Sequence, residues 1–575
     1  MHFSPPLSSA SDRRPPALKR GLVAARSFVL AAAAAGAACY SPEELRDRAD
    51  RDAYALIDAR RERLFGDQGP FALPAATAAF GRDDATGELL TLRDEVLAGA
   101  LEAIGPLDEV GAMGVAEQNS ESVQRQKETL YTSALSLAEE EWRFGYRYNA
   151  DGVASVSGDA GGELVAADAG FGASVTRVLG SGATILASLG ADLFRFVSTG
   201  DGWDAISTAG VSITQPLLRG SGRLVTLEPL RQTERDLVYA VRAYERFRRT
   251  FAVDVAGRVY RVQQSLDQQK NETENFRNLQ SLSRRNKALY EAGQLSRVQS
   301  DQAIQEELRS QNQLVILQGN VDRQLDLFKV FLGLPIQVDL TFEDAILARL
   351  VTEEELRFLE TLDGKDDEVV TFAIENRLDV MTAFDRVQDT VRREAILRDA
   401  LRAGLGLSAS ADSSSDEGRP FGHRAEDAQL SARLDLDLPV DLLPARNAWR
   451  RAELALVDER RSYERFLDQV TIDVRDALRR ARNSAESLRI QLDAVDLSVD
   501  RARGAQLQLE AGRASTRDLL EAQEALRSVR DAATSARISF KLALYELQLQ
   551  LEILRVDEGG IFVDPDLEAQ LLSLR

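Results

Sequence analysis

The hydrophobic positions of this chain follow two different periods in different segments. Segment 446–503 contains no Gly or Pro, and its apolar and small residues recur at alternating steps of four and three, with a single 4–4 step. This spacing keeps a narrow stripe against a partner helix, as in a coiled coil. A helix of this length measures about 87 Å, which no ordinary globular domain needs. The stripe comprises Tyr463, Leu467, Val470, Val474, Ala477, Ala481, Ala485, Leu488, Leu492, Val495 and Val499. Long helices are predicted over 222–292, 294–331, 445–511 and 513–555.

Other segments alternate with a period of two. Between positions 430 and 442, Leu, Ala and Val interleave with polar residues. A charged face opposite an apolar face is typical of a membrane barrel strand, whose apolar side meets lipid and whose charged side lines the lumen. A similar run covers 404–411, and the polar stretch 412–427 is predicted to be the loop between the two strands. The predicted lumen-lining charges are Arg433, Asp435, Asp437 and Asp441.

The first half of the chain shows the same order less clearly. Candidate strands span 183–193 and 209–215, and aromatic residues alternate with polar ones over 142–149. Rings at that spacing suit either an interfacial girdle or an ordinary edge strand just below the membrane.

An internal repeat connects the two halves. Gly293, within Tyr-Glu-Ala-Gly, matches Gly512, within Leu-Glu-Ala-Gly, at an offset of 219 residues, and Pro216 matches Pro439. The similarity of 100–103 to 373–376 has an offset of 273 residues. The first repeat therefore carries about 54 additional residues before Pro216, and the Gly- and Asp-rich stretch 149–203 is the natural place for them.

Composition excludes several classes of function. The formal net charge of -21 argues against a nucleic-acid partner, because phosphate binding requires clustered Lys and Arg. With two His and one Cys in 575 residues, a zinc site or a Cys–His nucleophile is not expected, and no phosphate-binding Gly-Lys-Ser/Thr loop occurs. We predict no cofactor and no enzymatic activity.

The N-terminus indicates export. A basic leader precedes the apolar run 27–38, which is too short to span a bilayer as a helix, and no later run reaches the required length. Residues 1–38 are predicted to be a signal peptide. The single cysteine, Cys39, follows Gly-Ala-Ala and resembles a lipoprotein acylation site; the alternative is an ordinary signal peptide with an incidental cysteine.

Local motifs resemble those of the TolC-like outer-membrane efflux proteins. Ile-Thr-Gln-Pro-Leu-Leu-Arg-Gly at 213–220 resembles the exit from strand to helix in that family. Similar matches occur at the two helical turns (290–293 and 509–522), at the end of a helical hairpin (331–335) and at the start of the second repeat (373–377). The resemblance covers roughly 90–555.

The resemblance implies a mostly α fold with a membrane β-barrel. Long antiparallel coiled-coil helices would form a periplasmic tunnel, and each chain of a homotrimer would add four strands to a shared 12-stranded barrel. Four strands cannot close a barrel alone, and an open strand edge would leave backbone hydrogen-bonding groups unpaired in lipid. Trimerisation satisfies this constraint. The implied function is that of a passive exit duct in the outer membrane, working with a periplasmic adaptor and an inner-membrane pump.

The family plan also assigns roles to the helical turns. Gly293, Leu295, Gly512 and Ser515 are expected to dock the adaptor, although each glycine could simply end a helix. Asp518, Gln299 and Asp301 are candidate gate residues, whose alternative interpretation is a solvated helix face. By position, the expected organisation is an N-terminal segment 39–89, a first repeat 90–337, an equatorial segment 338–371, a second repeat 372–555 and a tail 556–575.

Two other classes of function remain. A coiled-coil envelope tether without a pore would explain the helices but has no use for an apolar strand face opposite aspartates. An envelope hydrolase would need a nucleophile with its base, and both His2 and His423 fall in segments ill suited to catalysis.

Overall fold

The computed structural model describes residues 40–66, 69–73, 106–158, 164–196, 204–343, 347, 350–416, 419, 422–557 and 560–573. The predicted signal peptide and Cys39 lie outside these residues. The chain forms two compact units, one comprising 1–56, 135–234 and 395–449, and the other 57–134, 235–394 and 450–575.

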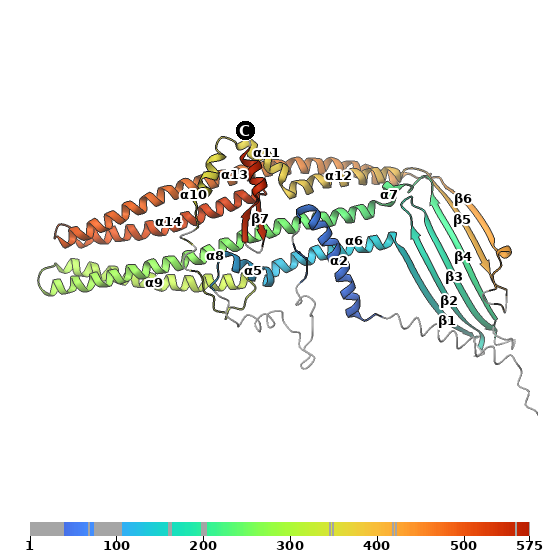
Figure 1. Cartoon of the computed structure of the whole chain (residues 1–575), viewed down its shortest axis with the longest axis horizontal. Helices are drawn as coiled ribbons and strands as arrows, with labels where there is room; N and C mark the ends of the chain where they lie inside the picture. Colours follow the sequence, from blue (N-terminus) through green and yellow to red (C-terminus); the bar gives the residue numbers. More distant parts are fainter. Residues whose placement is uncertain are drawn as a thin grey trace, which may run out of the picture. The chain divides into compact units, whose positions relative to one another are not determined.

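The first unit is built around an antiparallel sheet in which every strand pairs with its neighbours in chain order (Figure 1). The register runs through the whole sheet without interruption apart from one irregularity beside Gly158. A short 3-10 turn, Ala425–Asp427, precedes the last strand. The strands are β1 (Tyr146–Gly158), β2 (Leu164–Val178), β3 (Thr184–Phe196), β4 (Asp204–Pro216), β5 (Gly404–Ser414) and β6 (Gln429–Asp437).

The expected number of four strands per chain is wrong, because this sheet has six. The additional strands β1 and β2 occupy part of the Gly- and Asp-rich stretch in which the repeat offsets predict extra residues. Strand β2 is difficult to recognise from its sequence because small residues occupy both faces: Ala, Gly and Ser on one and Ala on the other. Small residues give little contrast between an apolar and a polar side, so the period of two is weak there.

Two strand boundaries also differ from expectation. Trp142 and Phe144 belong to helix α6 (Glu121–Phe144), so only Tyr146 and Tyr148 of the alternating aromatic run lie on a strand. Strand β6 ends at Asp437. The alternation that continues to Leu442 is therefore not a strand, and it leads into the next helix.

Long helical hairpins dominate the second unit. Helix α8 (Glu228–Glu291) turns into α9 (Arg297–Phe331), and α13 (Leu443–Glu510) turns into α14 (Thr516–Gln550). These ranges confirm the four long helices predicted from periodicity. At about 1.5 Å per residue, the 68 residues of α13 extend about 100 Å.

The predicted stripe of α13 is buried in its middle. Val470, Val474, Ala477, Ala481 and Leu488 are inaccessible to solvent, whereas Leu492 and Val499 remain over one third exposed. The buried part packs with α14 and with the segment that links the two repeats. That segment contains α10 (Glu353–Thr361) and α11 (Asp366–Asn376), and α12 (Leu378–Asp399) follows it.

The remaining elements are short. The C-terminal hairpin of β7 (Leu554–Asp557) and β8 (Gly560–Val563) precedes α15 (Pro565–Leu572), whose Leu571 joins the core of α13 and α14. A second core unites α5 (Glu109–Asn119) with α8, α9 and α14. The other helices are α2 (Pro42–Phe65) and α7 (Arg223–Thr226). In the described part of the chain, no helix is both long enough and apolar enough to cross a membrane.

Candidate functional site

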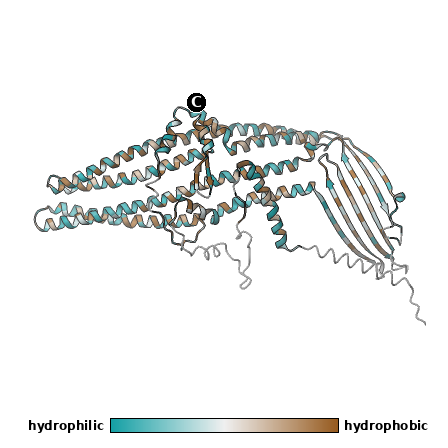
Figure 2. Ribbon diagram, viewed as in Figure 1, coloured by the Kyte–Doolittle hydropathy of each residue, from teal (hydrophilic) through white to brown (hydrophobic). Residues whose placement is uncertain are grey.

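One face of the sheet is apolar and exposed from edge to edge. The paired rows carry aromatic, aliphatic and alanine side chains, and the strands alternate between hydrophobic and paler positions in Figure 2. Tyr148 is 76% exposed, Leu189 63% and Leu430 81%. In water an apolar surface of this extent would be unfavourable, so this face requires an apolar environment.

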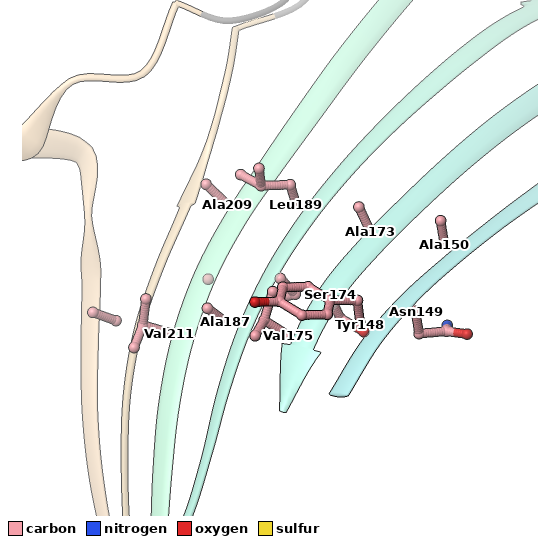
Figure 3. Close-up of a pocket in the computed structure, with 13 residues that line it drawn as sticks. Tyr148, Asn149, Ala150, Ala173, Ser174, Val175, Ala187, Leu189, Ala209 and Val211 are labelled. Carbon is pink, nitrogen blue, oxygen red and sulfur yellow. The ribbon is translucent and has the colours of Figure 1, made fainter. Parts of the chain in front are cut away.

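The middle of this face forms a shallow hollow (Figure 3). Tyr148, Val175, Ala187 and Val211 lie in one row across β1 to β4, and Ala150, Ala173, Leu189 and Ala209 form the next row. All these side chains except the Tyr148 hydroxyl are apolar. Asn149, Ser174 and Ser188 also line the hollow, but by register they belong to the opposite face, so the hollow extends the hydrophobic surface.

Arginines and tyrosines mark the limits of the apolar face. At the end of the sheet where β1 begins, the Arg177 guanidinium donates a hydrogen bond to the Tyr146 hydroxyl and lies 4.4 Å from the centre of the Tyr146 ring. Arg195 lies on the same face near the other end of β3. Aromatic and basic side chains of this kind are typical of membrane interfaces.

The opposite face is polar and acidic. Aspartates outnumber arginines on it, and both kinds are spread over several strands. Its charged residues within the described strands are Arg147, Asp151, Asp168, Asp192, Asp204, Asp412, Arg433, Asp435 and Asp437. Sequence analysis identified the charges of β6 but missed those of β1 to β5, because recognising a shared face requires knowledge of strand pairing.

Glycines provide the space for three of these aspartates. Asp151 lies opposite Gly172, and a Cβ atom on that glycine would stand 2.9 Å from the carboxylate. Asp192 opposite Gly170 and Asp412 opposite Gly210 repeat the arrangement, with corresponding separations of 2.6 Å. The Gly- and Asp-rich composition therefore reflects carboxylates that lie over glycines of the neighbouring strand.

The four predicted lumen charges do not all have the expected position. Arg433, Asp435 and Asp437 lie on the polar face of β6. Asp437 accepts a hydrogen bond from Arg219, which compensates its charge. Asp441 lies beyond the strand and accepts a hydrogen bond from the Leu443 backbone N–H at 3.0 Å, so it belongs to the start of α13 and not to the sheet.

The two helical turns have the same geometry. Gly293 and Gly512 have φ angles of +72° and +71°, a conformation that costs glycine little. In the first turn the Gln294 N–H bonds to the Leu289 carbonyl at 2.8 Å, and in the second the Arg513 N–H bonds to the Gln508 carbonyl at the same distance. Both helices thus end in a glycine-based cap.

The following helices begin in the same way. Ser296 and Ser515 are N-caps whose hydroxyls accept hydrogen bonds from the backbone N–H of Gln299 and Asp518, respectively. Asp518 completes a capping box, because its carboxylate accepts the Ser515 N–H at 2.8 Å. This backbone hydrogen bond and a second one from the Ser515 hydroxyl hold the pKa of Asp518 below its usual value.

The remaining predicted tip residues have ordinary surroundings. Leu295 is half-buried beside Gly293. Asp301 is exposed and forms an ion pair with Arg297 at 3.5 Å. Gln299 occupies the position in the first hairpin that Asp518 occupies in the second, so the two turns differ in charge at equivalent positions.

A polar ladder that the sequence analysis missed joins the two hairpins. It runs between α8 and α14 and ends near the turns, where buried Asn286 donates to Thr516 at 3.1 Å. Polar side-chain contacts of this kind fix which residues face each other, but each adds only a modest net stabilisation. Its other members are Gln264 with Ser535, Asp267 with Thr534, Asn271 with Asp531, and Glu272 with Arg527.

His423 lies closer to possible reaction partners than the sequence suggested. Its Nε2 is 3.0 Å from the Ser207 hydroxyl, and its Nδ1 is 3.0 Å from the Ser413 hydroxyl. A serine nucleophile is normally activated by a histidine that a carboxylate orients, and here a neutral hydroxyl occupies that position. Among the described residues, no group of His, Cys, Asp and Glu is arranged to hold a metal ion.

Comparisons with known proteins agree with this architecture. Residues 180–333 match the family model described as outer membrane efflux protein. No curated protein sequence matches the chain. Among solved structures, the outer membrane protein VceC of Vibrio cholerae is 13% identical, with a TM-score of 0.54, and the match covers 77% of this chain and 95% of VceC.

Two further structures are described as outer-membrane channels. The open state of MtrE from Neisseria gonorrhoeae is 13% identical, with a TM-score of 0.55, and the match covers 77% of this chain and 88% of MtrE. CmeC from Campylobacter jejuni is 12% identical, with a TM-score of 0.53, and the match covers 80% of this chain and 88% of CmeC. Residues 180–333 are therefore similar to the outer membrane efflux protein family, and the chain shares the fold of these outer-membrane channel structures.

Proposed function

We propose that this protein is the exit duct of a tripartite efflux or secretion system: a homotrimeric channel in the outer membrane that an inner-membrane pump drives through a periplasmic adaptor. The observation that carries the proposal is the two-sided sheet, apolar and exposed on one face and acidic on the other. Lipid accepts the first face and a water-filled lumen the second. The similarity of residues 180–333 to outer membrane efflux proteins supports location in the outer membrane, with the long helices in the periplasm.

The open sheet also supports assembly. Six strands with two unpaired edges would leave backbone N–H and C=O groups unsatisfied in lipid. Closure therefore requires other copies of the chain. The proposed repeats, 90–337 and 372–555, each supply strands and a helical hairpin to this assembly.

The proposal is tested by single-channel recording of the purified protein in a planar bilayer. Discrete conductance steps with a preference for cations are expected, since carboxylates dominate the polar face. A protein that extracts as a water-soluble monomer and gives no steps would contradict the channel and support the envelope tether.

We further propose that the two turns form the periplasmic mouth, where Gly293, Leu295, Gly512 and Ser515 contact the adaptor and Asp518 contributes to a gate. Because Asp518 also caps α14, replacement by Ala would alter fold and charge together. Asp518→Asn keeps a hydrogen-bond acceptor and removes only the charge, and Gln299→Asp adds a charge at the equivalent position.

If carboxylates at the mouth bind cations, Asp518→Asn raises resting conductance and antibiotic sensitivity, and Gln299→Asp lowers them. Asp301 lies two residues beyond Gln299 and pairs with Arg297, so Asp301→Asn tests whether that carboxylate belongs to the gate. Unchanged conductance in all three variants, with normal trimer yield, would exclude the proposed gate.

A further inference from the structure

The sheet has two free edges, and each is a full-length strand. Within the described residues β1 pairs only with β2, and β6 pairs only with β5. These edge strands have 13 and 9 residues and contain no Pro. Neither is shortened or blocked, as edge strands exposed to water usually are.

We propose that copies of this chain join through these edges. Strand β6 of one copy pairs antiparallel with β1 of the next, so that the six strands of each of three copies form a wall of 18 strands. This inference rests on the proposed function, from which it takes the trimer. It differs from the 12-stranded barrel that the family resemblance implies.

The extra hairpin β1–β2 has the two-sided character of the rest of the wall. One row of paired residues runs from Tyr148 through Val175, Ala187, Val211 and Ala411 to Leu430, and it is apolar throughout. The adjacent row begins at Asn149 and ends at Gln429, and it contains polar side chains and one glycine. A hairpin that lay outside the barrel wall would not need an apolar face and a polar face continuous with those of β3 to β6.

The directions of the two edge strands, and the offset between them along the sheet, are also compatible with closure into a barrel. With antiparallel pairing at every step, β1 and β6 run in opposite directions, so the edges of two copies meet as an antiparallel pair. Tyr146 is the first residue of β1, and its row of paired residues crosses the sheet to Ala432 of β6. Strand β6 then continues for five more residues, to Asp437. Such a step across a sheet is the shear that tilted barrel strands require.

Charge complementarity selects one register. Aligning the strand ends that adjoin the helices, with polar face beside polar face, puts Arg147 opposite Asp437 and Asp151 opposite Arg433 of the next copy. A shift of two residues in one direction puts Asp151 opposite Asp435. The same shift in the other direction pairs Arg147 with Asp435 but leaves Arg433 opposite Asn149, so it keeps only one of the two charge pairs. Like charges directly opposite are unfavourable, whereas opposite charges stabilise a cross-strand pair.

Within one copy Asp437 already pairs with Arg219, but Arg147 and Asp151 lack complete partners. The Arg147 guanidinium lies 5.7 Å from the centre of the Trp142 ring, and its Nε atom is buried without a hydrogen-bond acceptor. Asp151 receives only a long hydrogen bond from Asn149, at 3.4 Å. A neighbouring β6 would supply Arg147 with a carboxylate and Asp151 with a guanidinium.

The consequence is a wider duct. Barrel diameter grows roughly in proportion to strand number, so 18 strands give about 1.5 times the diameter of 12 strands and about 2.3 times the cross-section. Barrels of 16 to 18 strands enclose an aqueous channel. The outer-membrane part would accordingly admit bulkier cargo than a 12-stranded duct.

Disulfide cross-linking tests the edge and the register together. The variant Asn149→Cys/Asp435→Cys places two cysteines directly opposite each other across the proposed interface, and Asn149→Cys/Ser431→Cys separates them by four residues, about 13 Å. Leu186→Cys/Asp435→Cys tests the competing closure, in which β6 pairs with β3 and the hairpin lies outside the wall. The parent chain, which contains only Cys39, and the single-cysteine variants are the controls.

Oxidation should convert the first variant into covalent dimers and trimers on a non-reducing gel, while the second remains at least tenfold less cross-linked. Cross-linking of the Leu186 variant instead, in protein that still conducts, would overturn the inference and leave the proposed function intact. Absence of every cross-link together with absence of conductance would count against both.

A charge exchange gives a second readout that needs no disulfide. Arg433→Asp places like charges opposite each other and should lower the yield of heat-resistant trimer severalfold, and adding Asp151→Arg should restore it. Equal trimer yield in the single and double variants would contradict the register.

Discussion

At the residue scale, the second unit depends on ions that are removed from water. Glu552 is 2% exposed and bonds to Arg249, also 2% exposed, and to Arg246 at 2.7 Å. Burial raises the pKa of Glu552, and the neighbouring guanidinium groups oppose that rise. Because Glu552 also has a φ angle of +62°, the chain turns sharply at the point where its charge is neutralised.

Removing this buried carboxylate should be costly. Glu552→Gln leaves Arg249 charged and buried without its ion-pair partner, and breaking such a pair typically costs about 3–5 kcal/mol. The midpoint of chemical unfolding in detergent, followed by circular dichroism, measures the loss. Glu121→Gln is the matched control, since Glu121 pairs with Arg125 on an exposed surface and such pairs contribute about 0–1 kcal/mol. Equal shifts in the two variants would contradict the assignment.

Asp379 should make the stability of the second unit dependent on pH. Burial raises its pKa, but hydrogen bonds and charges from Arg377 and Arg246 outweigh burial, and the net pKa is below 3.8. A carboxyl group with a lowered pKa stabilises the fold above its usual pKa, and this stabilisation is lost as pH falls through the folded value.

Asp379→Asn should therefore destabilise the protein at neutral pH, and its difference from the parent should shrink as pH falls below 3.8. Unfolding curves of both proteins at several pH values provide the measurement. A difference that is independent of pH would show that the ionised form of Asp379 has no special role.

At the element scale, a helix or strand can be predicted from the sequence when its two faces differ strongly in hydrophobicity. The coiled-coil stripe around Val470 and Val474 and the Leu–Asp alternation of β6 are recognisable because each pairs large apolar residues with charged ones. Strand β2 has Ala167 and Ala169 on one face and Ala166 and Gly170 on the other, so its two sides look alike until β1 and β3 pair with it. The acidic face escaped prediction for a different reason, since only strand pairing brings Asp151 and Asp192 to one face of the sheet.

The glycine turns give a prediction at this scale. Gly512 has a positive φ and Gly504 lies inside α13 with open space around it. Gly512→Ala should destabilise the turn by about 1–2 kcal/mol, whereas Gly504→Ala should stabilise the helix by about 0.5–1 kcal/mol. Hydrogen exchange of the amides around residues 505–518 reports both effects. Changes of the same sign would contradict the proposed turn geometry.

At the scale of the whole molecule, selectivity should follow from charges that several strands contribute. Replacing Asp151, Asp168 and Asp192 by Asn removes carboxylates from the polar face and should move the reversal potential in a salt gradient toward zero. The shift should be smaller at high salt, where screening weakens these charges. Glu43→Gln, at an exposed position in the first turn of helix α2, is the control and should leave the potential unchanged. An unchanged potential in the triple variant would mean that this face does not line the conducting path.

The pairing of Tyr146 with Arg177 has a consequence for how such a duct can be altered. These residues stand side by side at the start of β1 and near the end of β2, so the hairpin enters and leaves the sheet at one point. Excising 146–178 would join Gly145 to Leu179 without requiring any helix to change length. In the proposed wall the calibre would in this sense be modular: a chain could gain or lose one hairpin at that point and keep its helical hairpins unchanged.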